Sequence, residues 1–289
     1  MGIGALEAGG TKMVLAIGNE KGEVFDKVTI PTKTPQETMP LMVEYFKKNK
    51  IESLGIGCFG PVDLRKESET YGYITSTPKL AWKNYNILGE FKEKLDIPVG
   101  FDTDVNAACL GEVYFGEGKN LENVVYITIG TGIGAGIFSQ GKLLHGNLHP
   151  EAGHIILKRH ALDEYEGKCP YHKDCFEGLA SGPSIEARFG KPAFELTDQN
   201  KVWEIESYYI AQAIVNYIMI LAPEKIILGG GVMHEEKLFP LIRKEVLKIL
   251  AGYLSTRELE NMEDYIVKSS LKDEQGIKGA LILGLEACG

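Results

Sequence analysis

The chain has 289 residues, of which 44% are hydrophobic and 25% are charged, so we expect a globular protein with one large or two smaller domains. Its formal net charge of −9 argues against nucleic acid or an anionic membrane as a partner. No run of about 18 apolar residues and no basic segment followed by an apolar one is found, so we expect no membrane span and no signal peptide. These features predict a cytoplasmic protein.

Two short apolar runs near the start of the chain flank a turn formed by Gly9, Gly10, Thr11 and Lys12. Glycine allows close approach of the backbone to a ligand, and the hydroxyl and ammonium groups that follow are donors for an anion. The segment predicts either a phosphate-facing turn between two strands or an ordinary β-hairpin. A P-loop and a dinucleotide fingerprint are excluded, because both require a helix directly after the glycines.

A similar pattern recurs later, where the apolar run 124–129 leads into Gly130, Thr131, Gly132 and a further glycine at 134. A strand, a glycine turn and a second strand therefore occur twice in the chain. Two such halves facing each other would place two glycine turns on opposite sides of one cleft. Clefts between domains are favoured places for ligands.

The rest of the chain alternates predicted helices with predicted strands, which favours α/β layers. Helices are expected from a capping box at 34–37, at 105–115, near 204–221 and 235–250, and at 277–287, with strands at 54–58, 97–101 and 225–228. We expect an N-terminal α/β domain over residues 1–118 and a C-terminal α/β domain over 119–289. The last helix is a candidate to pack back on the N-terminal domain.

Asp104 lies where a predicted strand ends and a helix begins, so its carboxylate is expected at the edge of a sheet. The positive end of the helix dipole favours the ionised form, which suits a base that hydrogen-bonds a hydroxyl. The alternative role for aspartate at this position is a plain helix N-cap.

Three consecutive glycines, Gly229, Gly230 and Gly231, follow the predicted strand 225–228. They indicate a place where the backbone approaches a ligand closely, such as the base or ribose of a nucleotide. A simple turn from strand to helix is the alternative.

Two of the five cysteines lie close together with a histidine between them. Cys169, His172 and Cys175 supply three zinc-type ligands at short spacing, and His154 is a candidate for the fourth ligand of a closed, structural site. Three other histidines lie nearby in the sequence and are alternatives for that fourth position. Unrelated surface residues are the other interpretation, whereas a disulfide is disfavoured without a secretion signal.

Together these motifs resemble the ROK family of bacterial sugar kinases, which has the actin-like, hexokinase-like ATPase fold with two α/β domains flanking a cleft. The resemblance covers nearly the whole chain. It is carried by the segments 7–12, 104–108, 129–134, 151–154, 169–177 and 228–232.

The resemblance implies a role for each matching residue. The general base on the sugar hydroxyl is Asp104. The implied sugar-site residues are Gly60, Pro61, Thr103, Asp104, Glu151, His154 and Glu177, and His154 is also implied to bind zinc. The implied ATP-binding residues are Gly9, Gly10, Thr11, Lys12, Gly130, Thr131 and Gly132 at the phosphates, and Gly229, Gly230 and Gly231 at the adenosine. Glu7 is implied to hold Mg²⁺ through water, so the expected cofactors are ATP, Mg²⁺ and structural zinc.

Two positions depart from the common family pattern: Glu7 stands where Asp is usual, and Thr103 stands where Asn usually precedes the catalytic Asp. Both departures, and the Cys-His-Cys spacing, are similar to the fructokinase-like branch. The resemblance therefore implies phosphorylation of a hexose by ATP, with D-fructose giving fructose 6-phosphate, in a homodimer whose partners are the sugar and ATP. The alternatives are a kinase for mannose, glucose or an N-acylated amino sugar, and a non-catalytic sugar sensor.

Overall fold

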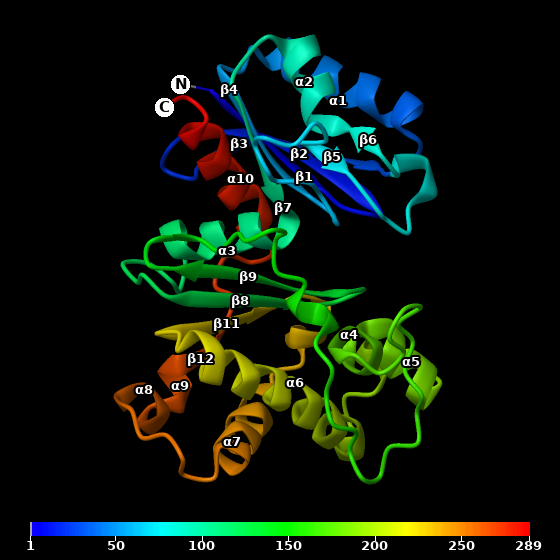
Figure 1. Cartoon of the computed structure of the whole chain (residues 1–289), viewed down its shortest axis with the longest axis vertical. Coiled ribbons are helices and arrows are strands. Elements are labelled where there is room, and N and C mark those ends of the chain that lie inside the picture. Colours follow the sequence, from blue (N-terminus) through cyan, green and yellow to red (C-terminus); the bar gives the residue numbers. More distant parts are fainter. Residues whose placement is uncertain (1) are drawn as a thin grey trace. The chain divides into compact units, whose positions relative to one another are not determined.

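The computed structural model describes residues 2–289, which form two compact units (Figure 1). Unit 1 extends to Lys119 and also contains Leu143–Pro150 and Glu274–Gly289, and unit 2 comprises Asn120–Lys142 and Glu151–Asp273. The segment Leu143–Pro150 was expected in the C-terminal domain. It belongs to unit 1 instead, because two of its histidines hydrogen-bond residues of that unit.

Unit 1 is built on a five-stranded sheet in the order β3-β2-β1-β4-β7. Its strands are β1 (Ile3–Ala8), β2 (Lys12–Gly18), β3 (Val24–Pro31), β4 (Ser53–Cys58) and β7 (Val99–Thr103). β1 pairs with β2 in antiparallel fashion, and β4 pairs in parallel with both β1 and β7. A small antiparallel pair joins β5 (Tyr73–Ile74) to β6 (Tyr85–Asn86).

Helices cover both faces of the unit 1 sheet, because the strands carry apolar side chains on both of these faces. Its helices are α1 (Pro35–Asn49), α2 (Ile87–Leu95), α3 (Asp104–Phe115) and α10 (Gln275–Glu286). On one face, Leu6 packs in a core with Phe46 of α1 and Phe91 of α2. On the other face, Ile3 and Ala5 pack against α10, which also contacts α3 extensively.

Unit 2 repeats this arrangement in a sheet with the order β10-β9-β8-β11-β12. Its strands are β8 (Val124–Ile129), β9 (Ile133–Ser139), β10 (Lys142–Leu143), β11 (Lys225–Gly229) and β12 (Ile266–Lys268). As in unit 1, an antiparallel hairpin with a glycine turn is followed by parallel strands. The mixed α/β prediction and the repeated strand, glycine turn and strand are both confirmed.

The helices of unit 2 build a large core on its sheet. They are α4 (Phe176–Ala180), α5 (Gly182–Phe189), α6 (Asn200–Leu221), α7 (Leu238–Leu250), α8 (Arg257–Glu260) and α9 (Met262–Tyr265). The long helix α6 contributes Trp203 and Tyr209 to the same core as Ile127 and Ile129 of β8. This packing fixes the strand end from which the second glycine turn begins.

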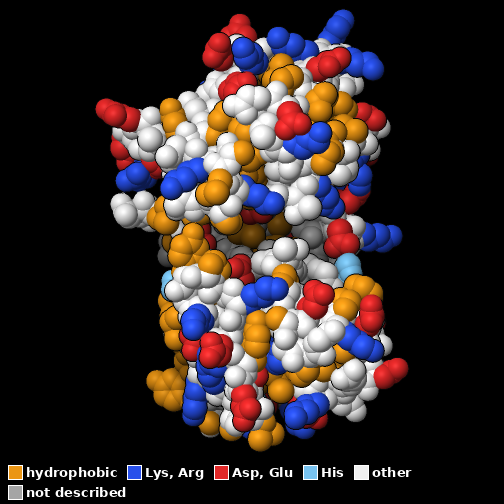
Figure 2. Space-filling model, turned by 90° about the vertical axis from the view of Figure 1, so that its right-hand side faces the viewer, with side chains coloured by type: hydrophobic (Ala, Val, Ile, Leu, Met, Phe, Trp, Pro, Cys, Tyr) orange, Lys and Arg blue, Asp and Glu red, His pale blue; other side chains and the backbone are white. Residues whose placement is uncertain are grey.

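The surface carries charges of both signs. On the face shown in Figure 2, Lys and Arg side chains are interspersed with Asp and Glu side chains. Within residues 2–289, no helix has the length and apolar character needed to cross a membrane.

Candidate functional site

The first glycine turn connects β1 to β2 in unit 1. Gly9 N donates to Lys12 O at 3.0 Å and closes the turn, while the side chains of Thr11 and Lys12 are exposed. A Cβ on Gly10 would lie 3.3 Å from Cε of Lys79, so the Lys79 side chain passes close to the turn. The turn therefore has backbone, hydroxyl and ammonium donors around it, including those of Lys79, which sequence reasoning did not connect with the turn.

Glu7 lies just before this turn, on the face of β1 that packs against α10. A Cβ on Gly276 would lie 2.7 Å from Cδ and Oε2 of Glu7, so the carboxylate is in contact with the first turn of α10. The N-terminal end of a helix favours a negative charge. The long side chain of Glu7 thus has a defined structural partner.

Asp104 is the first residue of α3, directly after β7. Its Oδ1 accepts a hydrogen bond from Val105 N at 2.9 Å, and its side chain is half-buried. The N-cap is Thr103, whose hydroxyl oxygen accepts from Asn106 N at 3.1 Å. The alternative interpretation of Asp104 as the N-cap is therefore wrong. Burial, with the negative charge of Asp104 as a second cause, raises the pKa of the Cys58 thiol.

Asp102, which sequence reasoning missed as a functional residue, organises this junction. Its Oδ1 accepts from Thr103 N at 2.7 Å and from Asn106 Nδ2 at 2.6 Å, and its Oδ2 lies 2.8 Å from His145 Nε2. The hydrogen bond to Asp102 raises the pKa of His145, although burial acts in the opposite direction. A buried carboxylate at the end of an otherwise apolar strand is the signal that could have identified it.

His149 supports the segment that follows β4. Its Nε2 accepts from Val62 N at 3.2 Å, and a Cβ on Gly60 would lie 3.5 Å from its Cε1. Gly60 is joined to Pro61 by a cis peptide bond. Burial lowers the pKa of His149, which keeps the ring neutral and Nε2 able to accept. His145 and His149 were alternatives for the fourth metal ligand, and the structure shows that both are bonded elsewhere.

The second glycine turn, in unit 2, connects β8 to β9. Gly130 N donates to Gly132 O at 2.9 Å, so this turn is one residue shorter than the first, in which Gly9 N donates to Lys12 O. Ile133 N donates to Glu177 Oε2 at 3.0 Å, and a Cβ on Gly132 would lie 2.8 Å from the same oxygen. Glycine at 132 therefore makes room for the Glu177 carboxylate, a contact that spacing in the sequence did not reveal.

Glu151 lies close enough to Glu177 for the two charges to interact. Although the surface of its side chain is exposed, surrounding protein atoms desolvate the carboxyl group. This desolvation, together with the negative charge of Glu177, raises the pKa of Glu151 to about 7. The carboxyl group can therefore either donate or accept a hydrogen bond near neutral pH.

A cavity of ≈ 640 Å³ lies beside the second glycine turn, entirely within unit 2. Gly130, Thr131 and Gly231 line it together with apolar residues, among them Phe194, whose side chain is 78% exposed. The backbone of Gly230 has a φ of 89°, and a Cβ there would lie 2.6 Å from Ile129 N. Glycine is thus required at 230, and the volume suits a ligand the size of a nucleoside.

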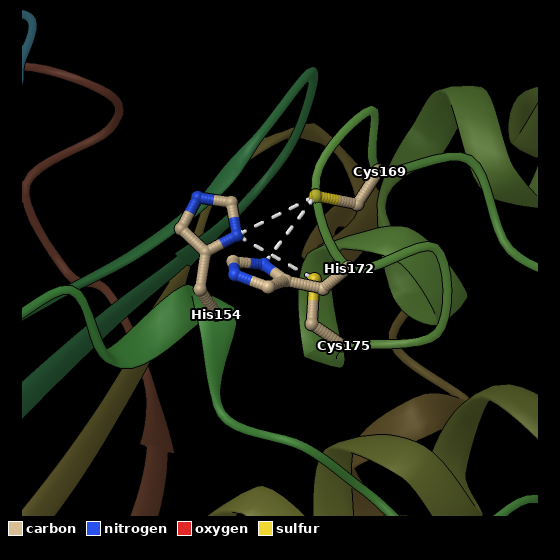
Figure 3. Close-up of side chains that lie close together, drawn as sticks. All are labelled: His154, Cys169, His172 and Cys175. Carbon is tan, nitrogen blue, oxygen red and sulfur yellow. Dashed lines mark hydrogen bonds between the residues drawn. The ribbon is translucent and has the colours of Figure 1, made fainter. Parts of the chain in front are cut away.

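The four predicted zinc ligands come together in unit 2 (Figure 3). His154 Nδ1 lies 3.8 Å from Cys169 Sγ and 3.5 Å from Cys175 Sγ, and His172 Nδ1 lies 3.7 Å from Cys169 Sγ. Zinc bonds of about 2.3 Å to sulfur and about 2.0 Å to nitrogen place tetrahedral neighbours about 3.5 Å apart. These three distances are close to the spacing in a tetrahedral zinc site, and all four ligand atoms lie within 4.8 Å of one another.

A tight loop presents these ligands. Cys169 and Lys173 exchange backbone hydrogen bonds of 3.3 and 3.0 Å, so the loop between the cysteines folds back on itself. Burial raises the pKa of the Cys175 thiol to about 11. A bound cation reverses that effect, because it stabilises the thiolate. The residues present fit a metal ion, and the structure brings the four predicted residues together.

Comparisons with known proteins agree with this arrangement. The sequence model of the ROK family matches residues 3–287. A Bacillus subtilis (strain 168) protein that carries the name "Putative fructokinase" is 55% identical over 286 residues, which cover 99% of this chain and 96% of that protein. A fructokinase of Pediococcus pentosaceus is 45% identical, with 99% of this chain and 98% of that protein covered.

The solved structures confirm the fold. The crystal structure of a ROK hexokinase from Thermus thermophilus superimposes with a TM-score of 0.81 at 23% identity. The match covers 100% of this chain and 99% of the hexokinase. The actin-like, hexokinase-like ATPase fold that the family resemblance implied is therefore confirmed.

Proposed function

The chain belongs to the ROK family, and from that premise we propose that it transfers the γ-phosphoryl group of ATP to O6 of D-fructose. The observation that carries the proposal is its near full-length similarity to relatives that bear the name fructokinase, at 45% and 55% identity. The products are fructose 6-phosphate and ADP.

Asp104 is the proposed general base. The sugar oxygen attacks the γ-phosphorus, the bond to the β,γ-bridging oxygen breaks, and the proton of the hydroxyl passes to the Asp104 carboxylate. Its position at the start of α3 supports this role, because the helix dipole favours the ionised carboxylate. Such proton transfer contributes about 10²–10⁴-fold to the rate.

We assign the remaining sugar contacts to the residues that the family resemblance implies for the sugar site. They are Gly60, Pro61, Thr103, Glu151, His154 and Glu177. Glu151 supports the assignment best, because a carboxyl group with a pKa of about 7 can accept from or donate to a sugar hydroxyl. For His154, Nδ1 faces the metal cluster, and Nε2 is the atom assigned to the sugar.

ATP is assigned to the two glycine turns and to the cavity of unit 2. The proposed phosphate contacts are the segments 9–12 and 130–134, and the adenosine is assigned to Gly229, Gly230 and Gly231. The cavity volume and its apolar lining around Phe194 support the adenosine assignment. Mg²⁺ enters with ATP, and Glu7 is proposed to hold it through water.

Zinc is the proposed ion of the Cys/His cluster. Two thiolates and two imidazoles are a donor set that zinc favours, and four protein ligands leave no open position. When bound, zinc supplies structural support rather than chemistry. His154, Cys169, His172 and Cys175 would hold it.

We also propose that the protein is a cytoplasmic homodimer, as the family resemblance implies. Light scattering of the purified protein measures the oligomeric state directly, and a monomeric mass would contradict the proposal.

A coupled assay of ADP release tests the proposed activity. D-fructose, mannose, glucose and N-acetylmannosamine are supplied in turn with ATP and Mg²⁺. We expect the highest kcat/KM with fructose. Higher kcat/KM with another sugar would reassign the substrate, and absence of ADP release with all four would favour a sugar sensor.

A further inference from the structure

The short helix α4 links the metal cluster to the second glycine turn. Its N-cap is the ligand Cys175, whose Sγ accepts from Gly178 N at 3.4 Å. Glu177 is the second residue of the helix, and its Oε2 accepts from Ile133 N at 3.0 Å. The helix that begins at a metal ligand therefore holds the C-terminal end of the glycine turn.

The far end of α4 holds the other end of the same turn. Gly182 follows the helix, and its N donates to Gly130 O at 2.8 Å. A Cβ on Gly182 would lie 3.2 Å from that carbonyl oxygen, so the two backbones are in close contact. One end of the turn, Ile133, is thus hydrogen-bonded to α4, and the other end, Gly130, is hydrogen-bonded to Gly182, the first residue of α5.

The second ligand-bearing segment contacts the turn from another side. His154 belongs to the 3₁₀ turn Ala152–His154, and a Cβ on Gly153 would overlap the carbonyl group of Ile133 and lie 3.5 Å from Gly134 N. Ile133 therefore has Glu177 on its N–H and Gly153 at its C=O. The 3₁₀ turn that carries His154 and the helix that begins at Cys175 therefore both contact Ile133, one at its C=O and the other at its N–H.

We propose that metal binding at the cluster positions the second glycine turn for the nucleotide phosphates, with Glu177 as the positioning residue. The inference rests on the proposed nucleotide site. An ion held by His154 and Cys175 fixes the two segments relative to each other, and they in turn fix Ile133. Coupling between two binding sites is reciprocal, so the nucleotide must strengthen metal binding by the same factor.

The test compares ADP binding by zinc-loaded and zinc-stripped protein. Zinc is removed with a chelator, the chelator is dialysed away, and both forms are titrated calorimetrically with ADP in the presence of Mg²⁺ and without sugar. We expect ADP to bind about 5–150-fold more weakly to the stripped form, which is the usual range of coupling between sites. Adding zinc back should restore the affinity.

Two substitutions of Glu177 test whether this residue connects zinc binding to ADP affinity. Glu177→Gln keeps an oxygen that can accept from Ile133 N, so its ADP affinity should stay dependent on zinc. Glu177→Ala removes that acceptor, so its ADP affinity should be reduced and depend much less on zinc. Zinc content and the near-ultraviolet circular dichroism spectrum confirm that both variants are folded and loaded.

A second measurement starts from zinc-loaded protein, so no zinc-stripped form has to be prepared. The equilibrium zinc affinity of the wild-type protein is measured by competition with a chromogenic chelator, with and without ADP and Mg²⁺. We expect ADP to raise the zinc affinity. Equal zinc affinity with and without ADP, or equal ADP affinity in the loaded and stripped forms, would overturn the proposal.

These outcomes separate the inference from the proposed function. Protein that binds ADP with zinc dependence but phosphorylates no hexose keeps the coupling and refutes the kinase proposal. An active kinase whose ADP affinity ignores zinc keeps the function and refutes the coupling. Failure of both forms to bind ADP would refute the nucleotide site, and the inference with it.

Discussion

Replacement of Asp102 should disrupt the junction that carries Asp104. In Asp102→Ala, Thr103 N and the buried Asn106 Nδ2 lose an acceptor at 2.7 and 2.6 Å. A buried donor left unpaired costs about 1–3 kcal/mol, so the two together should lower the free energy of unfolding by about 2–6 kcal/mol. The matched control is Asp102→Asn, whose amide oxygen can still accept from both donors.

Urea denaturation of the wild type and both variants measures these losses. Asp102→Asn should be less destabilised than Asp102→Ala, and it should lower the pKa of His145, which the carboxylate raises. The kcat of Asp102→Ala should fall more than its affinity for ADP, because Asp104 is displaced while the unit 2 cavity is intact, and Asp102→Asn should lose less kcat because both hydrogen bonds to Oδ1 are kept. Unfolding free energies within about 0.5 kcal/mol of the wild type for Asp102→Ala would refute this reasoning.

Three further predictions concern backbone strain, pH and metal. Gly230→Ala should destabilise the protein by about 1–3 kcal/mol from backbone strain alone, as measured by urea denaturation, and an unchanged midpoint would contradict the geometry. The pair of His145 with Asp102 should add stability below the unfolded pKa of 6.5, and this contribution should be lost as the pH rises through the raised folded pKa. Comparing the pH dependence of unfolding in the wild type and Asp102→Asn checks this, and identical profiles would refute it. Protein purified without added metal should contain about one zinc per chain, and chelation should lower its melting temperature; folded, active protein without zinc would contradict the site.

Patterns in the sequence predicted those parts of the site that are formed within one short segment of the chain. The glycine turns follow apolar strands, and the position of Asp104 follows from a strand that meets a helix. The spacing of Cys169, His172 and Cys175 indicated the metal cluster, and the structure brings His154, the candidate for the fourth position, beside them. In each case, the chemistry of one short segment limits what that segment can form.

The contacts that sequence reasoning missed join residues that are far apart along the chain. His145 and Asp102 are 43 positions apart, and His149 and Val62 are 87 positions apart. The bond from Ile133 to Glu177 spans 44 positions. No periodicity or spacing encodes such pairs, because they arise only after each unit has folded. For the same reason, Phe194 was not expected to line a cavity with the second glycine turn.

The activity of Asp104→Asn with fructose and ATP tests directly whether Asp104 is the general base. The amide oxygen of asparagine can still accept from Val105 N, so the variant should fold normally and retain its zinc. Its kcat for ADP release should fall by about 10²–10⁴-fold, the contribution expected of a general base. Near wild-type turnover by the folded variant would contradict the proposal that Asp104 accepts the proton.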